Sequence, residues 1–149
     1  MGCCVNKTDA FVEITGGTGA PQLSGCVQFY QENGCVLITA RICGLPKVSE
    51  TGFFGFHIHE GNICQGSDFS GTGSHYNPTR QVHPEHAGDL PPLIWCQGNA
   101  YLSFRTDRFS IKDIIGHTVV IHSDPDDFHT QPAGNAGRKI ACGVIRKGR

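Results

Sequence analysis

The chain of 149 residues is long enough for one domain with its own hydrophobic core, and we expect a single domain over residues 1–149. Its 12 basic and 13 acidic side chains leave a net charge of −1, which excludes a broad positive field for nucleic acid or an anionic membrane. A hydrophobic content of 38% with 20 glycines is typical of all-β proteins with many turns and argues against a helical bundle.

Eight short segments with alternating or β-branched hydrophobic residues predict strands. They are residues 10–15, 26–30, 35–42, 53–59, 93–95, 99–105, 117–122 and 139–145. The Asn33-Gly34 pair predicts a hairpin between the second and third segments, and Cys96-Gln97-Gly98 predicts another between the fifth and sixth. Residues 109–115 are expected to form a short turn or connection. The set predicts an all-β fold, an eight-stranded antiparallel sandwich or barrel.

Two long polar segments interrupt the strands. Residues 61–93 have no hydrophobic periodicity, and residues 123–138 form a second polar loop. A loop as long as the first is normally functional or disordered, and the three histidines in it favour a function.

The fourth strand carries two histidines on one face. Because side chains alternate along a strand, His57 and His59 point away from Phe56 and Ile58. The same parity places His122 opposite the inward-facing residues of its own strand. We therefore expect these three imidazoles to converge on an exposed wall of the barrel and to bind one ion.

The first loop adds further candidate ligands in a short stretch. They are His75, His83, His86 and Asp89. Three imidazoles and a carboxylate can form a tetrahedral zinc site, which would fix a loop that has no core of its own. His117 and His129 stand alone, and we interpret them as surface or hydrogen-bonded residues.

Several motifs of the chain resemble those of the copper/zinc superoxide dismutases. They are Gly-Phe-His-Ile-His-Glu, Gly-Ser-His-Tyr-Asn-Pro, His-Ala-Gly-Asp-Leu, Val-Val-Ile-His and Gly-Asn-Ala-Gly…Ile-Ala-Cys-Gly-Val-Ile. The resemblance covers nearly the whole chain, from the first strand to Ile145. It implies a Greek-key barrel with two long functional loops.

The resemblance also implies two metal cofactors, copper and zinc. The copper ligands would be His57, His59, His75 and His122, and the zinc ligands would be His75, His83, His86 and Asp89. His75 would bridge the two ions as an imidazolate. Asp126 matches an aspartate that hydrogen-bonds a copper ligand and a zinc ligand. Cys64 and Cys142 match an intrasubunit disulfide, although two free thiols are the alternative in a reducing compartment.

The chain departs from the family pattern in its last strand. The family has an arginine two residues before Ala141, where this chain has Lys139, with Arg138 just before it. A lysine keeps the charge but lacks the planar fork of arginine, so we expect Lys139 to guide the anion with turnover below the family's best. Arg138 is the alternative guide. The second loop carries Asp124, Asp126 and Asp127 in place of lysines, which predicts weak dependence of the rate on salt.

The spacing between two of the three implied zinc-ligand histidines is another departure. Only two residues separate His83 from His86, fewer than in better-known members of the family. We expect both imidazoles still to reach one ion.

The activity that the resemblance implies is superoxide dismutation, with superoxide as the substrate and O₂ and H₂O₂ as the products. Copper would cycle between Cu(II) and Cu(I), His75 would carry a proton, and zinc would orient His75. Two alternatives remain open: a non-catalytic protein that stores or transfers metal, and a module with zinc alone as a structural ion. We expect no nucleic-acid or membrane partner, and a homodimer remains open.

Six further cysteines have no role in this interpretation. They are Cys3, Cys4, Cys26, Cys35, Cys43 and Cys96, and we expect most of them to be reduced. Residues 1–7 fit neither a secretory signal nor an N-terminal lipidation signal, so we expect a cytoplasmic location unless an export signal was trimmed.

Overall fold

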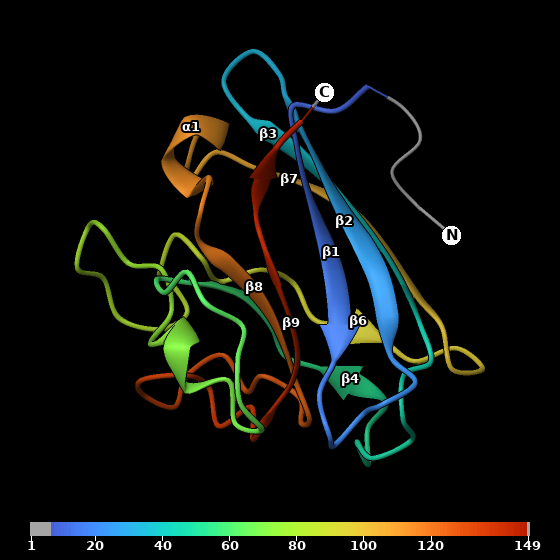
Figure 1. Cartoon of the computed structure of the whole chain (residues 1–149). Coiled ribbons are helices and arrows are strands. Elements are labelled where there is room, and N and C mark those ends of the chain that lie inside the picture. The colour runs from blue at the N-terminus through green and yellow to red at the C-terminus, as the bar shows by residue number, and fades with distance from the viewer. Residues whose placement is uncertain (1–6, 149) are drawn as a thin grey trace.

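Figure 1 shows the computed structural model, which describes residues 7–148. The strands are β1 (Ala10–Gly16), β2 (Ser24–Gln31), β3 (Val36–Cys43), β4 (Phe53–Phe54), β5 (Phe56–His59), β6 (Leu93–Ile94), β7 (Ala100–Thr106), β8 (Thr118–His122), β9 (Lys139–Val144) and β10 (Arg146–Lys147). Two short helices, η1 (Ser70–Thr72) and α1 (Ile111–Ile114), lie between them. Neither helix is long enough to cross a membrane.

The strands form an antiparallel barrel. The large sheet has the order β5-β8-β9-β1-β2-β3-β7, with β10 pairing beside β1, and β4 pairs with β6 in a second sheet. This second sheet joins the two ends of the first, because β4 leads directly into β5 and a bridge between Cys96 and Asn99 connects β6 to β7. The crossings from β3 to β5 and from β7 to β8 give the predicted Greek-key arrangement.

The core lies inside this barrel and follows the predicted alternation. On β3, for example, Val36, Ile38, Ala40 and Ile42 are at most 3% exposed. On the two strands that carry histidines, Phe56, Ile58, Val119 and Ile121 belong to the same core. The opposite faces of those strands are therefore left for polar side chains.

Two details of the predicted strands are wrong. The fourth strand breaks at Gly55, whose N–H donates to the carbonyl of Asp124 in the second loop rather than to a strand. The strand predicted at residues 93–95, which is β6, pairs with β4 and not with β7. Only the bridge between Cys96 and Asn99 remains of the hairpin expected between β6 and β7. The turn predicted at residues 109–115 contains α1, which begins with a capping box between Ser110 and Asp113.

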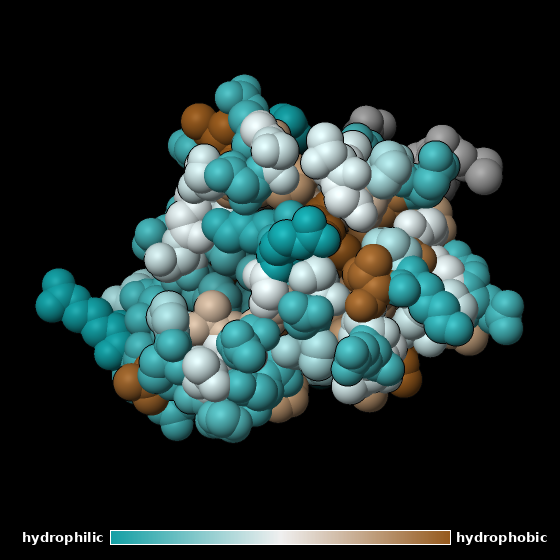
Figure 2. Space-filling view, turned by 90° about the horizontal axis from the view of Figure 1, so that it is seen from below, coloured by the Kyte–Doolittle hydropathy of each residue, from teal (hydrophilic) through white to brown (hydrophobic). Residues whose placement is uncertain are grey.

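The two long loops lie together beside β8 and β9. We call residues 60–92 the metal loop and residues 123–138 the second loop; in Figure 1 they are the green-to-yellow and orange-to-red segments beside these strands. Hydrogen bonds between His83 and Gln131 join them. Figure 2, seen from below, shows a mostly hydrophilic face with small hydrophobic groups among polar ones. Most exposed residues of the two loops are polar, although Ile63, Val82 and Phe128 are also exposed, and most of the loop histidines are buried.

Candidate metal centre

The outer wall formed by β5 and β8 holds three of the predicted ligands. These strands pair antiparallel, with His57 opposite Val120 and His59 opposite Thr118. The expectation of an exposed wall is wrong: His57, His59 and His122 are 0%, 2% and 3% exposed, because the two loops cover the wall. The parity prediction itself is correct, since all three rings lie on the side away from the core.

The metal loop reaches this wall by extending the sheet. Bridges pair His75 with His59 and Asp89 with His57. The N–H of Tyr76 donates to the carbonyl of Ile58 at 2.8 Å, and the N–H of Ile58 donates to the carbonyl of Gly88 at 2.8 Å. Each of these loop ligands is therefore placed beside a strand ligand by backbone hydrogen bonds, which no sequence periodicity reveals.

The first cluster consists of four imidazoles whose free nitrogens converge. Its members are His57, His59, His75 and His122, with the candidate ligand atoms all within 4.8 Å of one another. The Nε2 atoms of His59 and His122 are 3.2 Å apart. His57 Nδ1 and His75 Nε2 are buried and make no hydrogen bond. Buried nitrogens without a partner are costly, and a cation with a preference for imidazole would satisfy them.

The second cluster shares His75 with the first. Its members are His75, His83, His86 and Asp89. His75 Nδ1 lies 2.8 Å from Asp89 Oδ1 and 3.3 Å from His86 Nδ1, and His83 Nδ1 lies 3.1 Å from Asp89 Oδ2. Three nitrogens and one carboxylate fit the tetrahedral preference of zinc. His75 thus presents Nε2 to one cluster and Nδ1 to the other.

Asp126 connects the two clusters by accepting hydrogen bonds from one histidine of each. Its Oδ2 accepts a hydrogen bond of 2.8 Å from His57 Nε2, and its Oδ1 accepts one of 2.7 Å from His83 Nε2. These bonds fix the tautomers so that both Nδ1 atoms are free to bind a cation. Burial raises the pKa of Asp126, but the bonds from the two histidines outweigh it and lower the pKa below its usual range.

Backbone carbonyls orient the remaining rings of the first cluster. His59 Nδ1 donates to the carbonyl of Gly73 at 2.8 Å, and His122 Nδ1 donates to that of Gly137 at 3.4 Å. Both Nε2 atoms are therefore left as acceptors that face each other. This arrangement holds the rings as neutral ligands.

Burial keeps His57, His59 and His122 uncharged by lowering the pKa of each ring. It lowers the pKa of His57 to about 4 and that of His122 to about 3, and the neighbouring imidazoles add to the effect. Burial likewise lowers the pKa of His59. A neutral imidazole is the form that binds a metal ion, so the site is ready to bind at neutral pH.

Lys139 lies next to the first cluster, whereas Arg138 does not bond to it. A bulge in the β8–β9 ladder places Lys139 opposite His122. Its Nζ donates to Thr72 Oγ1 at 2.8 Å and to the carbonyl of Gly73 at 3.0 Å. The side chain of Arg138 is exposed, and both residues line a hollow of about 320 Å³.

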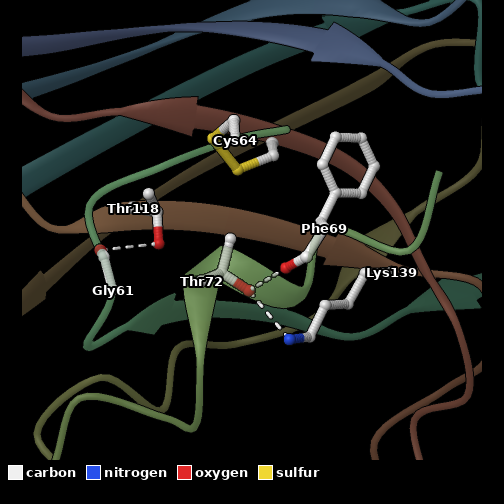
Figure 3. Close-up of a disulfide and its surroundings, with 7 residues drawn as sticks. Gly61, Cys64, Phe69, Thr72, Thr118 and Lys139 are labelled. Carbon is white, nitrogen blue, oxygen red and sulfur yellow. Dashed lines mark hydrogen bonds between the residues drawn. A yellow bond between two sulfur atoms is a disulfide. The ribbon is translucent and has the colours of Figure 1, made fainter. Parts of the chain in front are cut away.

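A disulfide joins Cys64 in the metal loop to Cys142 in β9, as the resemblance implied. With Phe69 and Val120 it forms a small hydrophobic cluster on the outer side of the wall. Figure 3 shows this disulfide near Phe69, with Lys139 reaching Thr72. Within residues 7–148, Cys35, Cys43 and Cys96 are free; Cys3 and Cys4 lie outside the described residues.

The sequence did not reveal the residues that support the ligands. They are Gly73 beside His59, Arg108 beside His86, Gln131 beside His83, and Gly134 beside Asp126. They act through backbone carbonyls, long side chains or a close approach, and these leave no pattern in a single sequence. Within the described chain, His117 and His129 lie outside both clusters, as expected.

Comparisons with known proteins agree with this geometry. The family described as copper/zinc superoxide dismutase matches residues 23–145. Superoxide dismutase [Cu-Zn] 2 of Aquifex aeolicus is 38% identical over 140 residues, covering 84% of this chain and 80% of that protein. Superoxide dismutase [Cu-Zn] 3 of Arabidopsis thaliana is 34% identical over 145 residues, covering 85% of each chain.

A solved structure with a similar fold is a double mutant of a SOD-like protein from Bacillus subtilis. It is 28% identical, with a TM-score of 0.79, and the match covers 91% of this chain and 96% of that one. A barrel of this topology, two histidine clusters that share one ring and a family match over most of the chain lead to one conclusion. The chain belongs to the copper/zinc superoxide dismutase family.

Proposed function

We propose that this protein is a superoxide dismutase that converts two superoxide anions and two protons into O₂ and H₂O₂. The first cluster would hold copper through His57 Nδ1 and the Nε2 atoms of His59, His75 and His122. The second would hold zinc through the Nδ1 atoms of His75, His83 and His86 and through Asp89. Copper would supply the one-electron oxidation and reduction that this reaction needs.

The observation that carries the proposal is the position of the His75 ring. Its Nδ1 faces Asp89 and His86, while its buried Nε2 has no hydrogen-bond partner and faces the first cluster. A single imidazole shared in this way suits a pair of neighbouring cations. A site for zinc alone would not need three further imidazoles, those of His57, His59 and His122, arranged on the far side of the ring.

The residues around the first cluster would handle the proton and the anion. His75 can hold a proton on Nε2 in one half of the cycle and give it to the product in the other. Lys139 presents a positive charge beside the carbonyl that orients His59, so it would attract and position the anion. The other ligands keep fixed tautomers through their bonds to Asp126, Gly73 and Gly137.

The test is to remove all metal, reload the protein with copper and zinc, and measure the decay of superoxide. We expect rapid decay with both metals and little with zinc alone. A His122→Gln variant should lose the activity, whereas His129→Gln should keep it, because the exposed ring of His129 lies outside both clusters. Decay at the uncatalysed rate with one copper and one zinc bound would reject the enzyme.

A non-catalytic metal-binding protein is the second candidate. It is favoured by Lys139, whose Nζ is held by Thr72 and Gly73 and is a point charge without a fork for an anion. In that case the reloaded protein would bind both metals and would transfer copper to a chelator without accelerating superoxide decay.

A further inference from the structure

We propose that Arg108 and Gln131 form a clamp on the backbone of residues 83–86 that positions the zinc ligands before the ion binds. The inference rests on the zinc site of the proposed function. It concerns residues that do not themselves bind metal, and it assigns them the role of positioning His83 and His86.

Arg108 holds the segment from the barrel side. Its Nη1 donates to the carbonyl of Pro84 at 2.8 Å and to the carbonyl of His86 at 3.0 Å. Its own backbone N–H donates to the hydroxyl of Thr106, the last residue of β7, at 3.2 Å. Arg108 thus links the segment, through its guanidinium, to β7, through its backbone N–H, and β7 has no candidate ligand of its own.

Gln131 holds the segment from the second loop. Its Oε1 accepts from the N–H of His83 at 2.9 Å, and its Nε2 donates to the carbonyl of His83 at 2.7 Å. One side-chain amide therefore satisfies both backbone groups of a single ligand residue. Its Nε2 also donates to the carbonyl of His129 at 3.1 Å, which keeps the amide in place.

The short ligand spacing gives the clamp its importance. Only Pro84 and Glu85 separate His83 from His86, and these residues have no place in the hydrophobic core. The N–H of Glu85 donates to the carbonyl of Val82 at 2.7 Å, so the segment is a tight turn. A turn of this size cannot adjust over several residues, so a displaced backbone would move both rings.

None of these hydrogen bonds involves a metal ion. They are expected to persist in the metal-free protein and to reduce the conformational entropy lost when zinc binds. Removing polar partners that orient metal ligands typically weakens metal binding by about 10- to 100-fold. The clamp therefore predicts a loss of zinc affinity without a loss of copper affinity.

The experiment compares two variants with two matched controls. Gln131→Met removes the amide at nearly the same side-chain length, and Arg108→Gln shortens the side chain so that it no longer reaches the two carbonyls. Arg105→Gln is the first control, because Arg105 pairs with Glu32 away from the loops, and Gln22→Met, at an exposed position, is the second. Arg108→Lys is added because a lysine can restore one of the two bonds.

The first readout is the zinc dissociation constant, measured by competition with a chelator. We expect both clamp variants to bind zinc at least about tenfold more weakly, Arg108→Lys to lie between Arg108→Gln and the wild type, and the copper affinity of the zinc-free protein to change little. The controls should match the wild type. Unchanged zinc affinity in both clamp variants, or an equal loss of copper affinity, would overturn the proposal.

The second readout separates the clamp from the zinc site itself. Hydrogen exchange of the His83 amide in the metal-free protein should be faster in Gln131→Met than in the wild type, because that N–H loses its acceptor. A wild type that binds no zinc would refute the proposed site, whereas zinc binding with exchange unchanged in the variant would refute the clamp.

Discussion

Lys139 donates a hydrogen bond of 3.0 Å from its Nζ to the carbonyl oxygen of Gly73. The same oxygen accepts the Nδ1 hydrogen of His59, so the lysine and a candidate copper ligand share one acceptor. The charge of Lys139 is therefore fixed near the first cluster. Half-burial lowers the pKa of Lys139, although the nearby Asp68 raises it.

The first prediction concerns the charge of Lys139. Lys139→Met should lower superoxide turnover by at least about tenfold, because the variant lacks the ammonium group that would donate a hydrogen bond to the superoxide anion. Lys139→Arg should raise turnover, since its fork can hold an anion with two donors. Initial rates at low salt measure both. Equal turnover of Lys139→Arg and wild type would count against Lys139 as the guide.

The second prediction concerns the stability of the metal-free protein against pH. The pKa values of His57 and His122 fall from 6.5 in the unfolded chain to about 4 and about 3 in the fold, so the unfolded chain takes up protons first. The free energy of unfolding should decrease as the pH falls from 6.5 to about 4, by up to about 1.4 kcal/mol per pH unit for each group.

Urea unfolding of the metal-free protein at several pH values measures this dependence. The lowered pKa of Asp126 acts in the same direction but at lower pH, because a carboxylate loses its contribution only when it is protonated. A His122→Gln variant should show a shallower dependence between pH 6.5 and 4. A free energy that stays constant over this range in the wild type would contradict the prediction.

The third prediction concerns the Cys64–Cys142 disulfide. It closes a loop with a sequence separation of 78 residues, so its loss should lower the free energy of unfolding by about 4 kcal/mol. Cys64→Ser is the better variant, because Cys142 is buried and its replacement would also bury a hydroxyl. Cys43→Ser, at an exposed free thiol, should differ from the wild type by less than about 0.5 kcal/mol in denaturant unfolding. An equal effect of the two variants would show that the disulfide does not stabilise the fold.

The fourth prediction concerns Gly134, which has a φ of 71° and lies against Asp126. A Cβ at this position would collide with Asp126 Oδ1 and stand 2.6 Å from His83 Nε2. Gly134→Ala should displace the carboxylate and weaken zinc binding by about 10- to 100-fold, as measured by competition with a chelator.

Gly98→Ala is the matched control for Gly134→Ala. Gly98 has a φ of 82°, and no atom lies within 4 Å of its added Cβ. The Gly98→Ala variant should therefore have the same backbone strain as Gly134→Ala, about 1–2 kcal/mol, without a change in zinc affinity. Similar zinc affinities for the two variants would show that the contact with Asp126 is unimportant.

The alternation of side chains along the strands was enough to predict which face of β5 and β8 carries the histidines. His57, His59 and His122 follow from alternation, because a two-residue repeat fixes which face each side chain occupies. The break at Gly55 and the pairing of β6 with β4 could not be predicted, because they depend on hydrogen bonds to segments far away in the sequence. Local propensity carries no information about such partners.

The ligands in the metal loop followed from residue types, and their assignment to two clusters followed from the family resemblance. What the sequence could not show is how the loop is held. Gly73 contributes a carbonyl and Gln131 a side-chain amide, and neither residue type is characteristic of a metal site. The burial of the wall was missed for a related reason, because the cover comes from loops without any periodic pattern.

The common ring of His75 has a consequence for how the two ions would load. Because each cation would bind one nitrogen of the same imidazole, neither affinity is independent of the other. Thermodynamic reciprocity requires that the factor by which bound zinc changes the affinity for copper equals the factor by which bound copper changes the affinity for zinc. A substitution that affects only the zinc ligands should therefore leave the affinity for copper unchanged in the zinc-free protein, and should change it only when zinc already occupies the other nitrogen.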